Sequence, residues 1–274
     1  MGKESLIFQG LLVLVTFVCI TQTTKTVYDS SNFPQHNHKL IESNYTPRGE
    51  EYTLGNLTVY ETPNRSSKRV LIHIYDIFGM SVNIRQVADS MAALHDFRVV
   101  IPRIFREEYW NEGNFPPANH SELDIWVEEN ASWEKVAKYD VLNIINWFQT
   151  RENITEFAIF GMCYGGIIST MAATEIPEIK AAGLVHPTYV TNEHAEGVKA
   201  PMYLLPTSTD ADFLPFYEVL KTKFGDNCGH RRMTDMVHGF AGAGGDFSDP
   251  LTVQRVEEVI DILGVFFNKN LNNS

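Results

Sequence analysis

The chain has 274 residues, and 44% of them are hydrophobic, which is enough to bury one substantial core. Its 22 Lys and Arg residues are outnumbered by 34 Asp and Glu residues, giving a formal net charge of −12. This acidic balance and the lack of any basic run argue against a nucleic-acid-binding protein.

The N-terminus has the pattern of a secretory signal peptide. Lys3 precedes an uncharged apolar stretch from Leu6 to Ile20, and small polar residues follow at 21–24. The stretch is rather short for a membrane span, so we expect residues 1–24 to be cleaved as a signal peptide. A signal anchor stays open as the alternative, because the small-residue cleavage site is weak. The sequence predicts a protein that is secreted or lies in the lumen of the secretory pathway, with no stable membrane span after cleavage.

Asn-x-Ser/Thr sequons support this compartment, because a cytosolic protein carries only a few of them by chance. N-glycosylation is predicted at Asn44, Asn56, Asn64, Asn119, Asn130, Asn153 and Asn272.

The rest of the chain reads as an N-terminal extension, polar and irregular over 25–50, followed by one domain over 51–274. Leu57 to Tyr60 is predicted as an edge strand, and the continuous apolar run from Val70 to Tyr75 as a central parallel strand. Residues 107–118 form a polar, aromatic loop that is expected to contribute to a lid. Further strands are predicted at 98–101, 157–160, 181–186, 201–205 and 231–236, and helices at 83–94, 133–148, 165–175, 215–224 and 250–269. Alternating strands and helices predict an α/β fold, a doubly wound, mostly parallel sheet with helices on both faces.

The segment from Phe160 to Gly166 has the strand–turn–helix context of a nucleophile elbow, with Cys163 where most such elbows carry Ser. Side chains at Gly161 and Gly165 would clash across so sharp a turn. The turn would present the sulfur above the sheet and direct the backbone N–H of Tyr164 at an oxyanion. The alternative is a Gly-rich turn with a buried structural Cys.

An acid and a base follow in the order that α/β-hydrolases use. Asp210 stands just past the predicted strand 201–205, and His238 follows an apolar segment and opens a loop of small residues. His238 could take the thiol proton and return it to the leaving group, while Asp210 holds the imidazole tautomer. Asp212 stays open as the rival acid.

These motifs, taken together, resemble the dienelactone hydrolase family, in its eukaryotic, carboxymethylenebutenolidase-like branch of α/β-hydrolases. Five segments carry the resemblance over roughly residues 50–270: Asp76-Ile77-Phe78-Gly79, Val99 to Arg106 with Trp110, Gly161 to Gly166, Ala182 to Pro187, and Val237 to Phe240. The resemblance implies a hydrolase that cleaves an ester or lactone of a small molecule through a Cys-Asp-His triad and an acyl-thioenzyme, without a cofactor. It places the oxyanion donors at the backbone of Tyr164 and Ile77. We expect a monomer.

The resemblance also implies roles for residues around the triad. Asp76 stands where family members often have a Glu that interacts with the thiol, and we expect Asp76 to raise the thiol pKa before substrate binds. Its shorter side chain leaves open that Cys163 pairs with His238 as a thiolate instead. Arg106 is the candidate for binding a substrate carboxylate. His186 is expected to line the pocket, with a capped strand end as the equal alternative.

Two cysteines follow the signal segment, Cys163 and Cys228. They are predicted at opposite ends of their strands, roughly 20 Å apart, whereas a disulfide needs Cα atoms within about 7 Å. Both are therefore expected to be free thiols. The other histidines lack ligand spacing, so no metal site is expected.

The competing function is a non-catalytic binding or interaction protein on an α/β-hydrolase scaffold. Arg103 replaces the Asp that the resemblance would place after Pro102, and this departure and Asp76 keep that alternative open.

Overall fold

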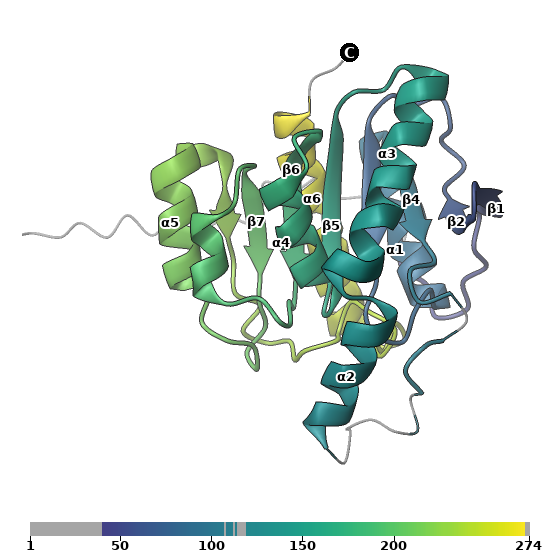
Figure 1. Cartoon of the computed structure of the whole chain (residues 1–274). Coiled ribbons are helices and arrows are strands. Elements are labelled where there is room, and N and C mark those ends of the chain that lie inside the picture. Colours follow the sequence, from purple (N-terminus) through teal and green to yellow (C-terminus); the bar gives the residue numbers. More distant parts are fainter. Residues whose placement is uncertain (1–39, 107, 112, 114–118, 272–274) are drawn as a thin grey trace, which may run out of the picture. The chain divides into compact units, whose positions relative to one another are not determined.

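The computed structural model describes residues 40–106, 108–111, 113 and 119–271. These residues form an eight-stranded sheet in the order β1-β2-β4-β3-β5-β6-β7-β8 (Figure 1). Pairing is antiparallel from β1 through β2 to β4 and parallel between all the other neighbours, which confirms the predicted mostly parallel sheet. The strands are β1 (Glu50–Leu54), β2 (Leu57–Glu61), β3 (Val70–Ile74), β4 (Arg98–Pro102), β5 (Phe157–Met162), β6 (Ile179–Val185), β7 (Met202–Leu205) and β8 (Gly229–His230).

The two strands at the centre of the sheet are buried along their whole length. β3 has the sequence VLIHI and β5 has FAIFGM, and every residue of both is buried. Such continuous apolar runs suit parallel strands that are covered on both faces. The prediction that 57–60 lies at the edge is wrong, because β1 pairs with β2 as a hairpin and takes the edge position.

Helices cover both faces of the sheet, as neighbouring residues of β5 show. Phe160 packs against Phe267 of α6 (Pro250–Asn270), with ring centroids 6.2 Å apart. The next residue, Gly161, lies so close to α4 (Gly165–Glu175) that an added Cβ would stand 2.7 Å from Ser169 Oγ. Because successive residues of a strand point to opposite faces, α6 and α4 cover opposite sides. In Figure 1, α4 lies in front of the sheet and α6 behind it.

The remaining helices begin and end at residues suited to those positions. α1 (Val82–His95) begins after Ser81, whose hydroxyl accepts the Ile84 N–H, and ends at Asp96 in the left-handed conformation. α3 (Lys138–Glu152) follows a π-helical turn, η3 (Trp133–Ala137), and also ends on a left-handed residue, Asn153. In the chain, α5 (Leu214–Phe224) connects β7 to β8.

Two segments differ from the sequence-based expectation. The predicted strand at 231–236 is wrong: β8 stops at His230, and only a single bridge joins Met233 to Thr207. The Arg232 side chain of this segment bonds outside the sheet, where it donates to the carbonyl oxygens of Asp210 and Ala211. Sequence reasoning also missed α2 (His120–Asn130), which lies beyond the lower end of the sheet in Figure 1.

Candidate active site

Cys163 sits at a strained turn between β5 and α4. Its φ is 52°, in the left-handed region that non-glycine residues seldom adopt and that functional sites often retain. The turn closes tightly because Gly161 and Gly165 have no side chains: a Cβ on Gly161 would stand 1.8 Å from the Gly165 carbonyl oxygen. The Cys163 side chain is partly exposed at the carboxyl edge of the parallel strands. This local geometry is that of a nucleophile elbow.

Asp210 and His238 come together from the loops after β7 and β8. His238 Nδ1 lies 2.7 Å from Asp210 Oδ1. The other carboxylate oxygen of Asp210 accepts from the backbone N–H of Thr207 at 2.6 Å and from its hydroxyl at 2.7 Å. Thr209 Oγ1 accepts the backbone N–H of His238 at 2.9 Å. Both carboxylate oxygens therefore accept hydrogen bonds, and those from Thr207 hold the carboxylate in place beside the imidazole.

The surroundings of His238 favour its protonated form. Burial lowers the pKa of His238, but the hydrogen bond to Asp210, the interaction with Cys163 and the charges of both groups outweigh burial and raise the pKa to about 10. The pKa of Asp210 is lowered: burial raises it, and the hydrogen bonds from His238 and Thr207 together overcome burial. An imidazolium between a carboxylate and a sulfur can stabilise a thiolate and later protonate a leaving group.

Asp212, the rival acid, has a different place. Its Oδ1 accepts the backbone N–H of Leu214 at 3.0 Å, at the start of α5, and the residue is exposed. A hydrogen bond joins His238 to Asp210, so the geometry favours Asp210 over Asp212.

The two expected oxyanion donors follow β5 and β3, which are neighbouring parallel strands. Tyr164 follows Cys163 directly, and Ile77 is buried in the turn after β3. Within the described residues, neither backbone N–H donates to a protein acceptor, as an oxyanion-binding site requires. The Tyr164 side chain is fully buried and its hydroxyl donates to the carbonyl of Ala131.

Asp76 joins the segment of Ile77 to the loop that carries His238. Its Oδ1 accepts the Phe78 N–H at 2.9 Å and its Oδ2 accepts the Ala243 N–H at 2.7 Å. Gly242 makes this approach possible, because a Cβ there would stand 2.3 Å from Oδ2. The predicted influence of Asp76 on the thiol stays a prediction, and the observed bonds give the residue a structural role in addition.

Arg106 and His186 were predicted to contact substrate, and the structure gives each of them protein neighbours. The Arg106 guanidinium makes a bidentate ion pair with the buried Asp140, at 2.7 and 3.0 Å, and the Arg106 side chain stays 45% exposed. His186 is fully buried with its ring edge-on to His238, 4.9 Å between centroids, and burial lowers its pKa to about 3. Substrate binding by these two residues stays a prediction.

Sequence reasoning missed the contribution of α2 to this edge of the sheet. Trp126 of α2 packs edge-on against Phe105, 4.8 Å between centroids, and Asp124 accepts the hydroxyl of Tyr189 at 2.9 Å. One signal was present: Asn119 and Glu122 have the spacing of a capping box. The lid expected at 107–118 lies mostly outside the described residues.

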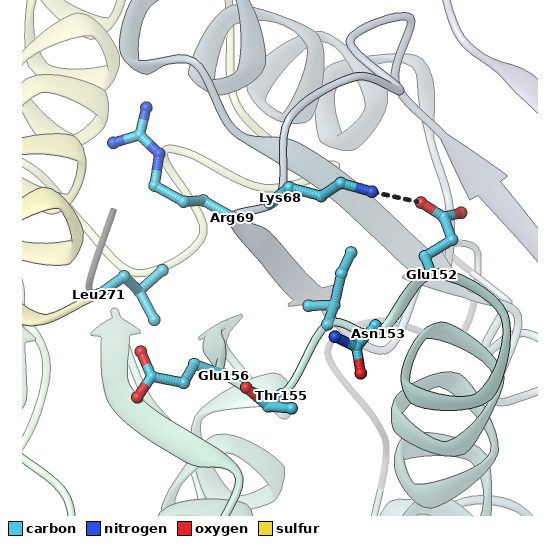
Figure 2. Close-up of a pocket in the computed structure, with 8 residues that line it drawn as sticks. Lys68, Arg69, Glu152, Asn153, Thr155, Glu156 and Leu271 are labelled. Carbon is cyan, nitrogen blue, oxygen red and sulfur yellow. Dashed lines mark ion pairs between the residues drawn. The ribbon is translucent and has the colours of Figure 1, made fainter. Parts of the chain in front are cut away.

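A cavity of about 200 Å³ is lined by residues that do not include Cys163, Asp210 or His238, and Figure 2 shows its lining. Lys68 and Arg69 line it just before β3, and Glu156 lines it just before β5. These positions are at the amino ends of the parallel strands, whereas Cys163 is at the carboxyl end of β5. The cavity is therefore not part of the candidate active site.

The other predicted positions divide by exposure. Asn44, Asn56, Asn119 and Asn153 are exposed, Asn64 and Asn130 are half-buried, and Asn272 lies outside the described residues, as does the expected signal peptide at 1–24. Cys163 and Cys228 are both free thiols, as predicted. Among the described residues there is no group of His, Cys, Asp and Glu that could hold a metal ion, and no described helix is long and apolar enough to cross a membrane.

Comparison with known proteins gives a consistent family and fold. The sequence profile of the Dienelactone hydrolase family matches residues 57–257. The chain is 27% identical over 237 residues to an uncharacterized AIM2 family protein of Schizosaccharomyces pombe, covering 81% of this chain and 92% of the relative. It is 24% identical over 242 residues to the carboxymethylenebutenolidase homolog of Mus musculus, covering 85% and 94%.

Solved structures share the fold at low sequence identity. A candidate dienelactone hydrolase of Klebsiella pneumoniae superposes with a TM-score of 0.61 at 17% identity, covering 81% of this chain and 98% of the other. An esterase of Pyrococcus furiosus superposes with a TM-score of 0.56 at 14% identity, covering 84% and 97%. The predicted α/β-hydrolase fold is thereby confirmed.

Proposed function

Because the chain belongs to the dienelactone hydrolase family, we propose that it hydrolyses an ester or lactone bond of a small molecule through Cys163, His238 and Asp210. The observation that carries the proposal is the 2.7 Å contact between His238 Nδ1 and Asp210 Oδ1, and the electrostatic interaction of His238 with Cys163 supports it. This is the nucleophile–base–acid arrangement that acyl transfer requires.

In the first half of the reaction, the Cys163 sulfur attacks the substrate carbonyl carbon. The carbonyl oxygen becomes an oxyanion and accepts hydrogen bonds from the backbone N–H groups of Tyr164 and Ile77. As the tetrahedral intermediate collapses, the bond to the leaving oxygen breaks and His238 gives that oxygen its proton. The products are a thioester on Cys163, a neutral imidazole and an alcohol, which an ester releases and a lactone keeps attached to the acyl group.

In the second half, water releases the acyl group. Neutral His238 takes a proton from the water as the water oxygen attacks the thioester carbonyl, and the thiolate leaves. Asp210 holds the imidazole tautomer throughout and stabilises the imidazolium that forms again. The enzyme returns with a thiolate facing an imidazolium.

The test is hydrolysis of an activated ester, such as p-nitrophenyl acetate, by wild type and two Cys variants. Cys163→Ala should lose about three decades of activity or more, because no other group supplies the nucleophile. Cys228→Ala is the matched control and should keep most of the activity, since Cys228 bonds the Gly225 carbonyl beyond the other end of the sheet. Equal activity of Cys163→Ala and wild type would refute the proposal. Turnover of no ester or lactone in a panel by the folded wild type would favour the binding-protein alternative.

We further infer that the protein enters the secretory pathway, on the support of the apolar N-terminal segment and the sequons. Expressed in a secretory host, it should reach the medium, lack its first twenty-odd residues and fall in apparent mass after glycosidase treatment. Retention in the cytosol with Met1 intact would contradict this. A membrane-bound product that keeps its apolar segment would favour a signal anchor.

A further inference from the structure

The end of β6 and the segment that follows it bond to both backbone groups of Cys163, the N–H and the carbonyl. The Cys163 N–H donates to the Val185 carbonyl at 3.1 Å, and the Thr188 N–H donates to the Cys163 carbonyl at 2.9 Å. Between them, Pro187 touches α4 so closely that a Cβ on Gly166 would stand 2.6 Å from Pro187 Cβ. The elbow and this segment are therefore held in fixed register.

The segment is also strained at two positions. His186 has a φ of 39° and Tyr189 a φ of 62°, both in the left-handed region. Non-glycine residues seldom adopt this conformation, and it persists where the surrounding structure over-determines it. The two strained residues flank Pro187 and Thr188, and Thr188 bonds directly to Cys163.

This turn brings the Thr188 hydroxyl within hydrogen-bond distance of the Cys163 sulfur. Thr188 Oγ1 donates to Cys163 Sγ at 3.2 Å, and the backbone bond between the same two residues fixes that approach. A hydroxyl that donates to a thiolate makes a charge-assisted hydrogen bond, about twice as strong as a neutral one. His238, from the loop after β8, also interacts electrostatically with Cys163, and the Thr188 hydroxyl is the group that donates to the sulfur at a hydrogen-bond distance.

We propose that the Thr188 hydroxyl is a further catalytic group, which stabilises the thiolate of Cys163 in the empty enzyme and releases the sulfur when it becomes a thioester. The proposal rests on the proposed function in one respect, that Cys163 is the nucleophile. A thioester sulfur carries no charge and accepts hydrogen bonds weakly. The interaction is therefore made with the free thiolate and lost in the acyl-enzyme, and it sets the fraction of enzyme that is ready to attack.

The test is the pH dependence of iodoacetamide alkylation at Cys163, read by peptide mass spectrometry without any substrate. Thr188→Val keeps the branched shape and removes the hydroxyl. We expect it to raise the apparent pKa of the thiol by about one unit and to slow alkylation about tenfold below that pKa. Thr188→Ser returns the hydroxyl and should restore the wild-type profile.

Two controls separate this effect from a change in folding. Thr174→Val makes the same side-chain change at a hydroxyl that donates to the Thr170 carbonyl in α4 at 2.9 Å and not to the sulfur, and it should leave the profile unchanged. Alkylation of Cys228 in each variant reports whether the fold is intact. If Thr188→Val does not fold, Thr188→Ala removes the same hydroxyl with a smaller side chain, and its alkylation profile tests the same claim.

A Cys163 alkylation profile of Thr188→Val that superimposes on wild type would overturn the proposal, as would a shift that Thr188→Ser does not reverse. Alkylation requires no turnover, so the two claims fail separately. If the profile shifts but neither wild type nor any variant hydrolyses an ester, the proposed function fails, and only the stabilisation of the thiolate by Thr188 stands. If ester hydrolysis needs Cys163 but the profile does not shift, only the role of Thr188 fails.

Discussion

Asp210 binds His238 through one carboxylate oxygen and is bound by Thr207 through the other. An anion held in this way can orient an imidazole without taking its proton. Asp212, two residues further on, is exposed and bonds the first turn of α5. The two carboxylates make a matched pair for mutation, because they share one loop but differ in their partners.

Asp210→Asn should lower kcat for an activated ester by about two to four decades, and Asp212→Asn by no more than a few-fold. The amide keeps the shape of Asp210 but removes the charge and the control of the tautomer. Steady-state kinetics at saturating ester, with circular dichroism to verify folding, measures both variants. A larger fall in Asp212→Asn would transfer the acid's role to that residue.

Individual site residues could be predicted where a local motif encodes them. Cys163 lies in a glycine-rich elbow, and Asp210 and His238 follow apolar runs, so the sequence itself points to them. The Thr188 hydroxyl on the sulfur and the pairing of Arg106 with Asp140 join segments far apart in the chain. No local pattern records such contacts, because they exist only once the sheet has brought the segments together.

At the scale of elements, α2 is held to the rest of the described structure by its aromatic face. Trp126 packs on Phe105 and also lies edge-on to Trp110, with centroids 5.6 Å apart. The neighbouring residue Ile125 points outward and is 57% exposed. Two adjacent large apolar side chains therefore have different roles in one helix.

Trp126→Ala should loosen α2, while Ile125→Ala should leave it in place. The Trp change removes half-buried aromatic contacts worth about 2 kcal/mol, less than those of a fully buried Trp. Hydrogen exchange of the α2 amides should then speed up by about tenfold or more in Trp126→Ala only. Equal exchange in the two variants would mean that the aromatic contacts do not hold the helix.

Elements with a buried, continuous pattern were predicted well, and those defined by tertiary partners were not. α4 begins and ends where its small-residue pattern predicted, and β3 differs by one residue. β1 has the sequence EEYTL and is mostly exposed, so it lacks the apolar signal of a strand. Residues 231–236 contain charged side chains that bond to loops and to α6. These bonds outweigh the strand preference of the apolar residues between them.

At the scale of the whole molecule, buried histidines tie stability to pH. His73 in β3 is fully buried and stacks on Phe160 with centroids 4.1 Å apart, and burial lowers its pKa to about 3. The same group titrates near 6.5 in the unfolded chain. Between these pH values the unfolded state binds more protons, so His73 stabilises the fold above about pH 6.5 and loses that contribution as the pH falls toward 3.

His73→Phe should therefore flatten the pH dependence of stability. It keeps a ring for the stack on Phe160 and removes a slope of up to about 1.4 kcal/mol per pH unit. Urea unfolding at pH 6.5 and pH 4.5 should show wild type losing more stability than the variant across that interval. A wild-type loss no larger than that of His73→Phe would contradict the burial argument.

The central claim is that hydrolysis passes through a thioester on Cys163. The most direct measurement is peptide mass spectrometry of the Asp210→Asn variant, acid-quenched during reaction with an activated acyl ester, because slowed release of the acyl group lets the intermediate accumulate. The account predicts one acyl adduct, on the peptide that contains Cys163 and not on the peptide that contains Cys228. Consumption of the ester with the acyl group on another residue, or with Cys163 unmodified throughout, would contradict it.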